Sequence, residues 1–155
     1  MHKIMFVCHG NICRSTMAEF LMKDLVKKHG VESDFEIQSS ATSSEELGNP
    51  VHYGTKAVLD RLNISCKGKY AVRLKASDYD KYDLFIGMDD YNVKNMLKIF
   101  GGDPQNKIKR LLEYANSSRS VADPWWTGDF DATYRDVKQG TDALFEFLGY
   151  TITEK

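Results

Sequence analysis

The chain has 155 residues, of which 42% are hydrophobic and 28% are charged, and its formal net charge is −1. Size and composition are typical of one soluble globular domain, so we expect a single domain over residues 1–155. The near-neutral charge predicts no general attraction to nucleic acid or anionic membranes, and no apolar run suggests a membrane span or signal peptide. Three cysteines do not make the disulfide framework of a secreted protein, which favours the cytoplasm.

The first predicted elements are a strand and a helix joined by a tight loop. Residues 3–7 are mostly apolar, β-branched or aromatic, as in a short buried strand. Apolar residues three and four positions apart indicate a helix over 15–29. Ser15 or Thr16 is expected to cap the start of this helix, because Thr16 and Glu19 have the spacing of a capping box.

The rest of the chain alternates strands with helices. Further strands are predicted at 35–39, 82–88 and 108–112, and further helices at 51–62, 90–100 and 133–148. A long Ser-, Gly- and Asn-rich loop spans 39–50, and an irregular, locally basic stretch at 64–80 is expected to be solvated. The alternation predicts an α/β domain with a parallel sheet covered on both faces, whose ligands bind beyond the carboxyl ends of the strands. Three polar residues follow predicted strands there: Cys8, Ser39 and Asp89.

Residues 8–14 combine a nucleophile with an anion cradle. The backbone N–H groups of such a loop and the positive end of the following helix suit an anion of phosphate size. A thiol beside a helix N-terminus and an arginine loses its proton easily, so Cys8 is expected to react as a thiolate. Arg14 can hold two phosphoryl oxygens, Gly10 permits a close approach or a positive φ, and Asn11 tolerates a left-handed conformation. The loop therefore predicts transfer of a phosphoryl group onto sulfur.

The predicted reaction also needs an acid, because the oxygen that leaves phosphorus must be protonated. Asp123 is the better candidate, since Pro124 holds it extended and fixes the following turn. Asp129 and Asp131 are its rivals, with a helix N-cap and a solvated turn as their alternative roles. His9 is adjacent to the nucleophile but is expected to point outward.

The sequence VCHGNICRS at residues 7–15 resembles the phosphate-binding loop of the low-molecular-weight protein tyrosine phosphatases. The resemblance extends to residues 39–43, 88–89 and 123–124, and so spans most of the chain. It implies a three-layer, Rossmann-like domain with a four-stranded parallel sheet and flanking helices. It also implies a phosphatase without metal or other cofactor, in which Cys8 attacks phosphorus and Asp123 is the general acid and base.

The resemblance also implies the rest of the site and its substrates. The expected catalytic residues are Cys8, Arg14 and Asp123; those expected to bind phosphate or substrate are His9, Gly10, Asn11, Ile12, Cys13, Ser15, Glu45, Trp125 and Trp126; Ser39 and Asp89 are expected to support them. In the family, the positions of Asn11, Ser15 and Ser39 hydrogen-bond the loop into shape. The expected substrates are phosphotyrosine-containing proteins and small aryl phosphates, and the enzyme is expected to be a monomer.

Two pairs of residues near the expected cleft affect the choice of substrate. Trp125 and Trp126 stand where the family usually carries aromatic residues, and they are expected to form the wall of a cleft for a phenyl ring. One of the two indoles is expected to anchor its loop to the core. Glu45 or Glu46 stands near a position that is aromatic in many members, and a carboxylate there is expected to disfavour acidic peptides.

Two roles are open for Cys13, five residues after the nucleophile. Under oxidation it could form a reversible disulfide with Cys8 and protect it from further oxidation, or it could simply be a small buried side chain. Cys66 has no partner in the sequence and is interpreted as structural.

Three other functions compete with the tyrosine phosphatase. A phosphoarginine phosphatase shares the fold, but that subgroup has threonine where this chain has Ile12. Thiol-coupled arsenate reduction needs a relay of further cysteines, and after Cys13 only Cys66 exists. A non-catalytic phosphate- or phosphotyrosine-binding module is disfavoured by the presence of the nucleophile, the arginine and the acid together.

Overall fold

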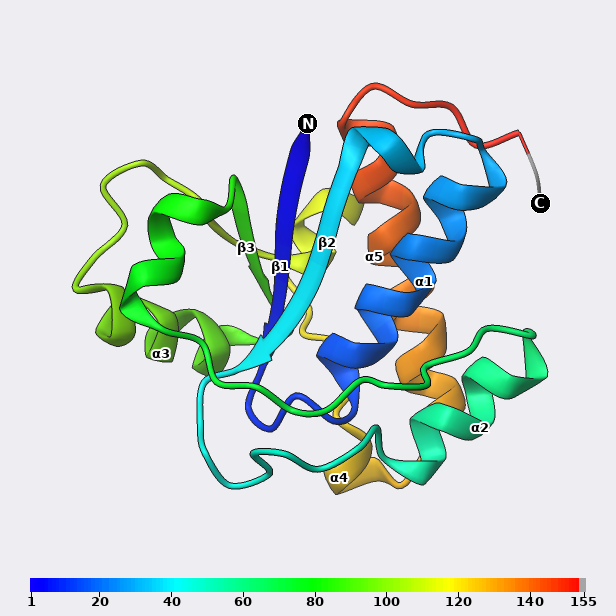
Figure 1. Cartoon of the computed structure of the whole chain (residues 1–155), viewed down its shortest axis with the longest axis horizontal. Coiled ribbons are helices and arrows are strands. Elements are labelled where there is room, and N and C mark those ends of the chain that lie inside the picture. Colours follow the sequence, from blue (N-terminus) through cyan, green and yellow to red (C-terminus); the bar gives the residue numbers. More distant parts are fainter. Residues whose placement is uncertain (154–155) are drawn as a thin grey trace.

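The computed structural model describes residues 1–153 and confirms the parallel α/β architecture (Figure 1). The last two residues of the expected domain, 154 and 155, lie outside this part of the chain. The described residues form one four-stranded parallel sheet in the order β2-β1-β3-β4. The strands are β1 (His2–Cys8), β2 (Phe35–Ala41), β3 (Leu84–Gly87) and β4 (Ile108–Arg110).

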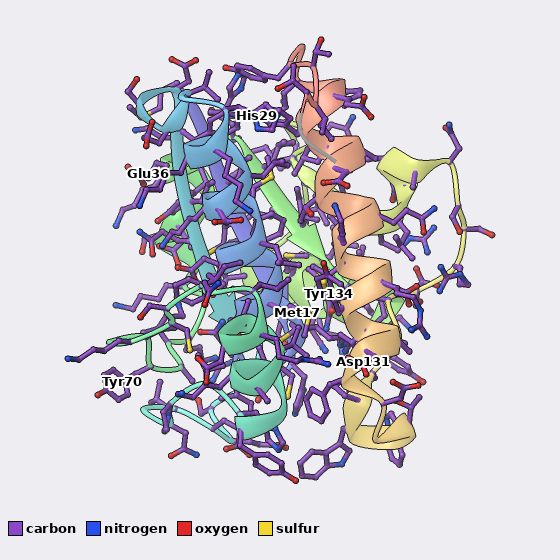
Figure 2. All side chains as sticks on the ribbon, turned by 90° about the vertical axis from the view of Figure 1, so that its right-hand side faces the viewer. Met17, His29, Glu36, Tyr70, Asp131 and Tyr134 are labelled. Carbon is purple, nitrogen blue, oxygen red and sulfur yellow. The ribbon has the colours of Figure 1, made fainter. Side chains whose placement is uncertain are left out.

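Helices cover both faces of the sheet. Their bounds are α1 (Arg14–Lys28), α2 (Tyr53–Arg61), α3 (Asp90–Phe100), α4 (Pro124–Thr127) and α5 (Phe130–Phe147), with short 3₁₀ helices η1 (Glu32–Asp34), η2 (Ala76–Lys81) and η3 (Leu111–Ala115). Helices α1 and α5 pack side by side over one face, and α3 lies on the other (Figures 1 and 2). Within residues 1–153, no helix is long and apolar enough to span a membrane.

The two hydrophobic cores follow from the alternation of side chains along β1. Ile4 and Phe6 are fully buried on the face covered by α1 and α5, where Met17 packs with them. Met5 and Val7 point to the opposite face and pack with Met96 of α3. A strand covered on both sides must be apolar throughout, which explains the unbroken apolar run that predicted it. Burial of β1 in the middle of the sheet fixes the position of the loop that follows it.

The predicted cap of the first helix is wrong. Helix α1 begins at Arg14, with Cys13 in the N-cap position and no side chain capping it. Ser15 and Thr16 already lie in the first turn, so their hydroxyls take other partners; Thr16 Oγ1 donates to the Cys13 carbonyl at 2.8 Å. Glu19 is also engaged elsewhere, so the capping-box spacing was coincidental.

Two predicted boundaries near the C-terminus also differ. The last strand ends at Arg110 rather than at Leu112, because Leu111 and Leu112 turn into η3 and bury their side chains against α5. Helix α5 begins at Phe130, earlier than expected, because Asp129 caps it by accepting a hydrogen bond from a backbone N–H of the first turn.

The stretch 64–80 is more ordered than its composition suggested. Residues 72–74 run along the edge of β2, where Leu74 N donates to the Ala41 carbonyl and Ala41 N donates to the Val72 carbonyl, both at 2.8 Å. Three of the four cationic side chains in this stretch are exposed, as expected. The side chain of the fourth, Lys69, is only 11% exposed. The prediction of a wholly solvated surface is therefore wrong for Lys69.

Candidate active site

The carboxyl-terminal edge of the sheet gathers the predicted site residues from four separate segments. At the lower end of Figure 1, the β1–α1 loop and the long loop after β2 lie close to α4. A cavity of about 480 Å³ opens at this edge, and Cys8, Arg14, Asp89 and Asp123 all line it. Residues that are more than 100 positions apart in the sequence therefore face one space, as the parallel sheet predicted.

The Cys8 thiol lies at the floor of this cavity. The residue is 4% exposed, and its sulfur accepts a hydrogen bond from the Asn11 backbone N–H at 3.3 Å. Asn11 has φ +59°, which is the left-handed conformation that the sequence allowed for. Gly10 has no positive φ; a Cβ there would lie 3.2 Å from Cγ of Glu46. Gly10 thus serves the close approach of another loop, the first of its two predicted uses.

A network of hydrogen-bonded side chains lies behind the loop and reaches the Cys8 sulfur. The Asn11 side-chain amide donates to Ser15 Oγ and to Ser39 Oγ, each at 2.9 Å, and its oxygen accepts from Val72 N at 3.1 Å. Ser15 Oγ lies 3.0 Å from Cys8 Sγ, and its hydrogen can donate to the sulfur when Cys8 reacts as a thiolate. The residues expected to hold the loop in shape are therefore in mutual contact.

The charged end of this hydrogen-bonded network, Glu19, was not predicted from the sequence. Ser39 Oγ donates to Glu19 at 2.5 Å, and the Glu19 side chain is only 2% exposed. Lys23 Nζ lies 2.5 Å from one of its oxygens and Lys69 Nζ lies 3.2 Å from the other. Lys69 also donates to the Ser39 carbonyl at 2.9 Å. A buried carboxylate needs such partners, because an unpaired charge there would be strongly destabilising.

A signal for this carboxylate was present in the sequence. Glu19 stands three and seven positions before Met22 and Val26, so it shares the buried face of α1 with them. A charged residue on an apolar stripe indicates a buried polar contact. Nothing in the sequence identified Lys69 as its partner, because the two residues are brought together only by the tertiary fold.

Arg14 is held in place beside Cys8 by two contacts. Its guanidinium is 5% exposed; Nη2 lies 2.9 Å from Asp89 Oδ2, and Nη1 donates to the Val121 carbonyl at 3.2 Å. Asp89 is itself fixed, because its other oxygen caps α3 by accepting from Asn92 N at 2.8 Å. Asp89 therefore supports the arginine directly. The Val121 carbonyl was not predicted, since a backbone acceptor leaves no trace in residue type.

Asp123 is the one of the three candidate acids that faces the cavity. It caps α4, where Oδ1 accepts from Trp125 N at 3.0 Å, and Oδ2 lies 3.4 Å from Arg14 Nη2. Asp129 caps α5, and the exposed Asp131 pairs with a surface arginine at 2.6 Å. Neither rival lines the cavity. Asp129 is the helix N-cap that was its predicted alternative role. Asp131 is exposed, as expected, but it lies in the first turn of α5 and not in a loop.

The prediction that one tryptophan anchors its loop is wrong. Trp125 is 70% exposed and Trp126 is 83% exposed. The buried residue of α4 is Pro124, the first residue of this one-turn helix. Both indoles nevertheless line the cavity, together with Tyr91 from the first turn of α3. Tyr91 was not among the predicted site residues, although its place two residues after Asp89 was a usable signal.

The loop after β2 is hydrogen-bonded to the β1–α1 loop. His9 points outward as predicted, and its Nε2 lies 2.9 Å from Glu45 Oε2. The His9 carbonyl accepts from both the backbone N–H and the hydroxyl of Ser43, and the Ile12 carbonyl accepts from His52 N at 2.9 Å. These bonds place Glu45 at the mouth of the cavity and leave the Ile12 side chain as part of its lining.

Cys13 lies in the cavity lining and is partly buried. Burial, with smaller contributions from Cys8 and Asp123, raises the pKa of the Cys13 thiol to about 12. Cys13 is therefore protonated at neutral pH. Its position agrees with either of the two roles that the sequence left open.

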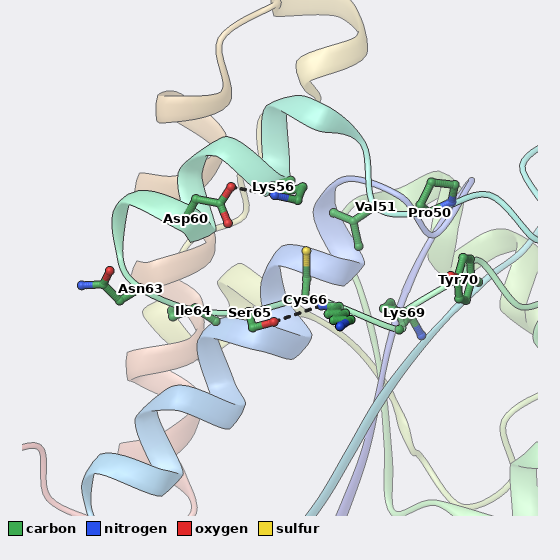
Figure 3. Close-up of a pocket in the computed structure, with 12 residues that line it drawn as sticks. Pro50, Val51, Lys56, Asp60, Asn63, Ile64, Ser65, Cys66, Lys69 and Tyr70 are labelled. Atoms are coloured by element: carbon green, nitrogen blue, oxygen red, sulfur yellow. Dashed lines mark hydrogen bonds and ion pairs between the residues drawn. The ribbon is translucent and has the colours of Figure 1, made fainter.

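A second cavity, of about 560 Å³, lies between α2 and the segment that follows it (Figure 3). Cys66 is part of its lining, is 7% exposed, and has its pKa raised by burial. Although this cavity is the larger one, Cys8, Arg14 and Asp123 do not line it. Lys69, which also lines this second cavity, donates to the Ser39 carbonyl behind the β1–α1 loop.

The sequence of this chain is similar to those of known proteins of one family. The sequence profile of the family described as low molecular weight phosphotyrosine protein phosphatase matches residues 3–153. The low molecular weight protein-tyrosine-phosphatase YfkJ of Bacillus subtilis is 38% identical over 146 residues, covering 93% of this chain and 94% of its own. PtpA of Staphylococcus aureus is 35% identical over 149 residues, covering 96% and 94%.

Solved structures show the same likeness. The crystal structure of YfkJ matches with a TM-score of 0.91 at 37% identity, covering 96% of this chain and 94% of that one. SP-PTP, a low molecular weight protein tyrosine phosphatase from Streptococcus pyogenes, matches with a TM-score of 0.87 at 38% identity, covering 97% and 95%. A Drosophila arginine phosphatase also matches, with a TM-score of 0.85, but at 24% identity it shares only the fold.

Proposed function

Because the chain belongs to the low-molecular-weight phosphotyrosine protein phosphatase family, we propose that it hydrolyses phosphotyrosine in proteins and small aryl phosphates through a phosphocysteine on Cys8. The observation that carries this proposal is the convergence on one cavity of the Cys8 sulfur, the Arg14 guanidinium and the Asp123 carboxyl group. Nucleophile, anion clamp and acid are the three groups that the reaction requires.

In the first step, the Cys8 thiolate attacks phosphorus and the bond from phosphorus to the phenolic oxygen breaks. Arg14 and the loop N–H groups hold the equatorial oxygens, and Asp123 gives a proton to the departing phenolic oxygen. Phosphoryl transfer needs little covalent assistance, so correct positioning and neutralisation of charge account for most of the catalysis. The ion pair from Asp89 to Arg14 supports that positioning, because it fixes the orientation of the planar guanidinium.

In the second step, water attacks the phosphocysteine and the sulfur–phosphorus bond breaks. Asp123, now deprotonated, accepts a proton from the water. The sulfur leaves as a thiolate, and the Ser15 hydroxyl, 3.0 Å from Cys8 Sγ, stabilises it by donating a hydrogen bond. The products are phosphate and the regenerated enzyme.

The same chemistry bears on cofactors, location and assembly. Charge neutralisation by Arg14 and nucleophilic attack by a thiolate leave no step for a metal or organic cofactor in this mechanism. A thiolate that must stay reduced fits the cytoplasm. We propose that the enzyme acts there as a monomer, without nucleic acid or membrane as a partner.

The experiment that tests this function compares phosphate release from phosphotyrosine and phosphoarginine peptides of the same sequence, without added metal. We expect phosphotyrosine to be the better substrate, because the apolar Ile12 lines the cavity beside the nucleophile and suits a phenyl ring. A metal chelator should leave the rate unchanged. Faster release from phosphoarginine would favour the arginine phosphatase instead, and loss of activity with chelator, restored by a divalent ion, would overturn the mechanism.

We propose the first of the two roles for Cys13, reversible oxidation with Cys8. Peroxide converts Cys8 to a sulfenic acid, and the Cys13 thiol then displaces water to form a disulfide. Mild peroxide should therefore inactivate the wild type, and a thiol reductant should restore most of its activity. In Cys13→Ser the loss should be largely irreversible, because Cys8 proceeds to higher oxides.

Activity after peroxide and after reductant is the measurement, and Cys66→Ser is the matched control because Cys66 lies outside the catalytic cavity. It should recover like the wild type. Full recovery of Cys13→Ser would show that Cys13 only fills space.

A further inference from the structure

The mouth of the catalytic cavity is acidic, although a cation lies at its floor. Glu45 and Glu46 stand at the mouth, and two further carboxylates lie deeper in the cavity. Among the described residues that line the cavity, the cationic side chains are Arg14, which is buried, and His9, which is cationic when protonated and pairs with Glu45. A substrate that carries a phosphate group must therefore pass two carboxylates before it reaches the arginine, and this repels substrates with further negative charge.

Both carboxylates of the mouth are held in place. Glu46 Oε2 accepts from Asn49 Nδ2 at 2.6 Å, and its side chain packs across Gly10 of the phosphate-binding loop. Glu45 Oε2 lies 2.9 Å from His9 Nε2. Each carboxylate has about four acceptor sites, so both retain the capacity to accept hydrogen bonds from a ligand. Arg73 donates to Ser44 beside Glu45 but does not line the cavity, so it leaves these acceptors open.

Three aromatic side chains complete the mouth. Tyr91 is 75% exposed, and Trp125 and Trp126 are 70% and 83% exposed, yet all three line the same cavity. Large aromatic groups that are exposed and gathered in one place mark a binding surface. Aromatic faces attract guanidinium and ammonium groups, and carboxylates attract the same cations.

We propose that this mouth is a subsite for a cationic side chain, arginine or lysine, that neighbours the phosphotyrosine of the substrate. The proposal rests on the proposed function and names the class of substrate. Glu45 and Glu46 bind the cationic group, and the aromatic side chains of Tyr91, Trp125 and Trp126 pack against its stem or its planar face. Recognition of a positive charge offsets the repulsion between the phosphate and the acidic mouth.

The test compares three phosphotyrosine peptides of equal length, in which the residues on both sides of the phosphotyrosine are arginine, alanine or glutamate. Free phosphotyrosine is measured in parallel. For the wild type at low salt, we expect kcat/KM of the arginine peptide to exceed that of the glutamate peptide by about tenfold. The ratio should fall at high salt, because exposed charges are screened.

Variants locate the effect. In the double variant Glu45→Gln/Glu46→Gln, the arginine-to-glutamate ratio should fall to near one, and any general change in activity cancels in this ratio. The matched control is Glu32→Gln/Glu36→Gln, which removes the same charge from two exposed positions at the opposite end of the sheet; Glu36 is labelled in Figure 2. The control should keep the ratio of the wild type.

The outcomes separate the subsite from the function. Good turnover with equal kcat/KM for the three peptides would overturn the subsite and leave the phosphatase intact. A preference for arginine that persists in Glu45→Gln/Glu46→Gln would overturn the assignment to these carboxylates. Absence of turnover for every peptide and for free phosphotyrosine would overturn the proposed function, and the subsite with it.

Discussion

Replacing Cys8 with serine is expected to reduce the turnover of phosphotyrosine by roughly 10⁴-fold or more, because a hydroxyl group is a far weaker nucleophile than a thiolate. Binding of inorganic phosphate should survive, since Arg14 and the loop N–H groups are unchanged. The buried setting also favours survival of the fold: a serine hydroxyl can keep the contacts to Ser15 and the Asn11 N–H. Steady-state kinetics and calorimetric titration with phosphate measure the two effects.

The matched control for this change is Cys66→Ser, a second buried cysteine that lies outside the catalytic cavity. It should retain the turnover of the wild type. Vanadate should inhibit the wild type competitively, as a mimic of the five-coordinate phosphorus. Retention of more than a few per cent of activity in Cys8→Ser would mean that another group attacks phosphorus.

Replacing Asp123 with asparagine should slow the attack on phosphotyrosine, whose phenol has a pKa of about 10, by about 10²–10⁴-fold. An aryl phosphate with a much more acidic phenol needs less protonation and should be affected less. Asparagine can still cap α4 through its side-chain oxygen, so the loop keeps its geometry and the effect reports on the proton. Formation of the phosphoenzyme, followed by rapid quench, is the measurement, because Asp123 also serves the later hydrolysis.

The matched controls are Asp129→Asn and Asp131→Asn, which change neighbouring carboxylates outside the cavity. Asparagine at 129 also preserves a cap for α5. Neither substitution should change the rate of phosphoenzyme formation differently for good and poor leaving groups. If Asp123→Asn slows phosphoenzyme formation equally for good and poor leaving groups, Asp123 has a different role.

Most of the fold could be predicted, because local patterns and global architecture agree in this chain. The apolar run at 3–7 predicted a strand buried on both faces, and β1 is the central strand that needs it. The errors lie at the ends of elements, where the tertiary contacts decide. Leu111 and Leu112 look like the end of a strand, yet they turn to bury themselves against α5.

The candidate site was predictable where one short segment carries its chemistry. Cys8 and Arg14 lie in one loop, and Asp123 is marked by the following proline. The supporting contacts were less accessible, because they join distant segments: Glu19 meets Ser39 and Lys69 only in the folded chain. The exposure of the tryptophan pair was also predicted wrongly, because residue type favours burial, whereas Pro124 is the residue of α4 that packs inward.

The most direct measurement is to trap the covalent intermediate during turnover. Asp123→Asn is mixed with an aryl phosphate whose phenol is strongly acidic, because formation of the phosphoenzyme then needs little protonation while its hydrolysis is still slowed; the reaction is quenched in acid within the first turnover and digested for mass spectrometry. We expect about one phenol per active site to be released in a burst, with the phosphoryl group on the peptide that contains Cys8. The same experiment on Cys8→Ser should give neither burst nor label. Release of the phenol and phosphate together, with no phosphorylated peptide at any time, would contradict the proposed mechanism.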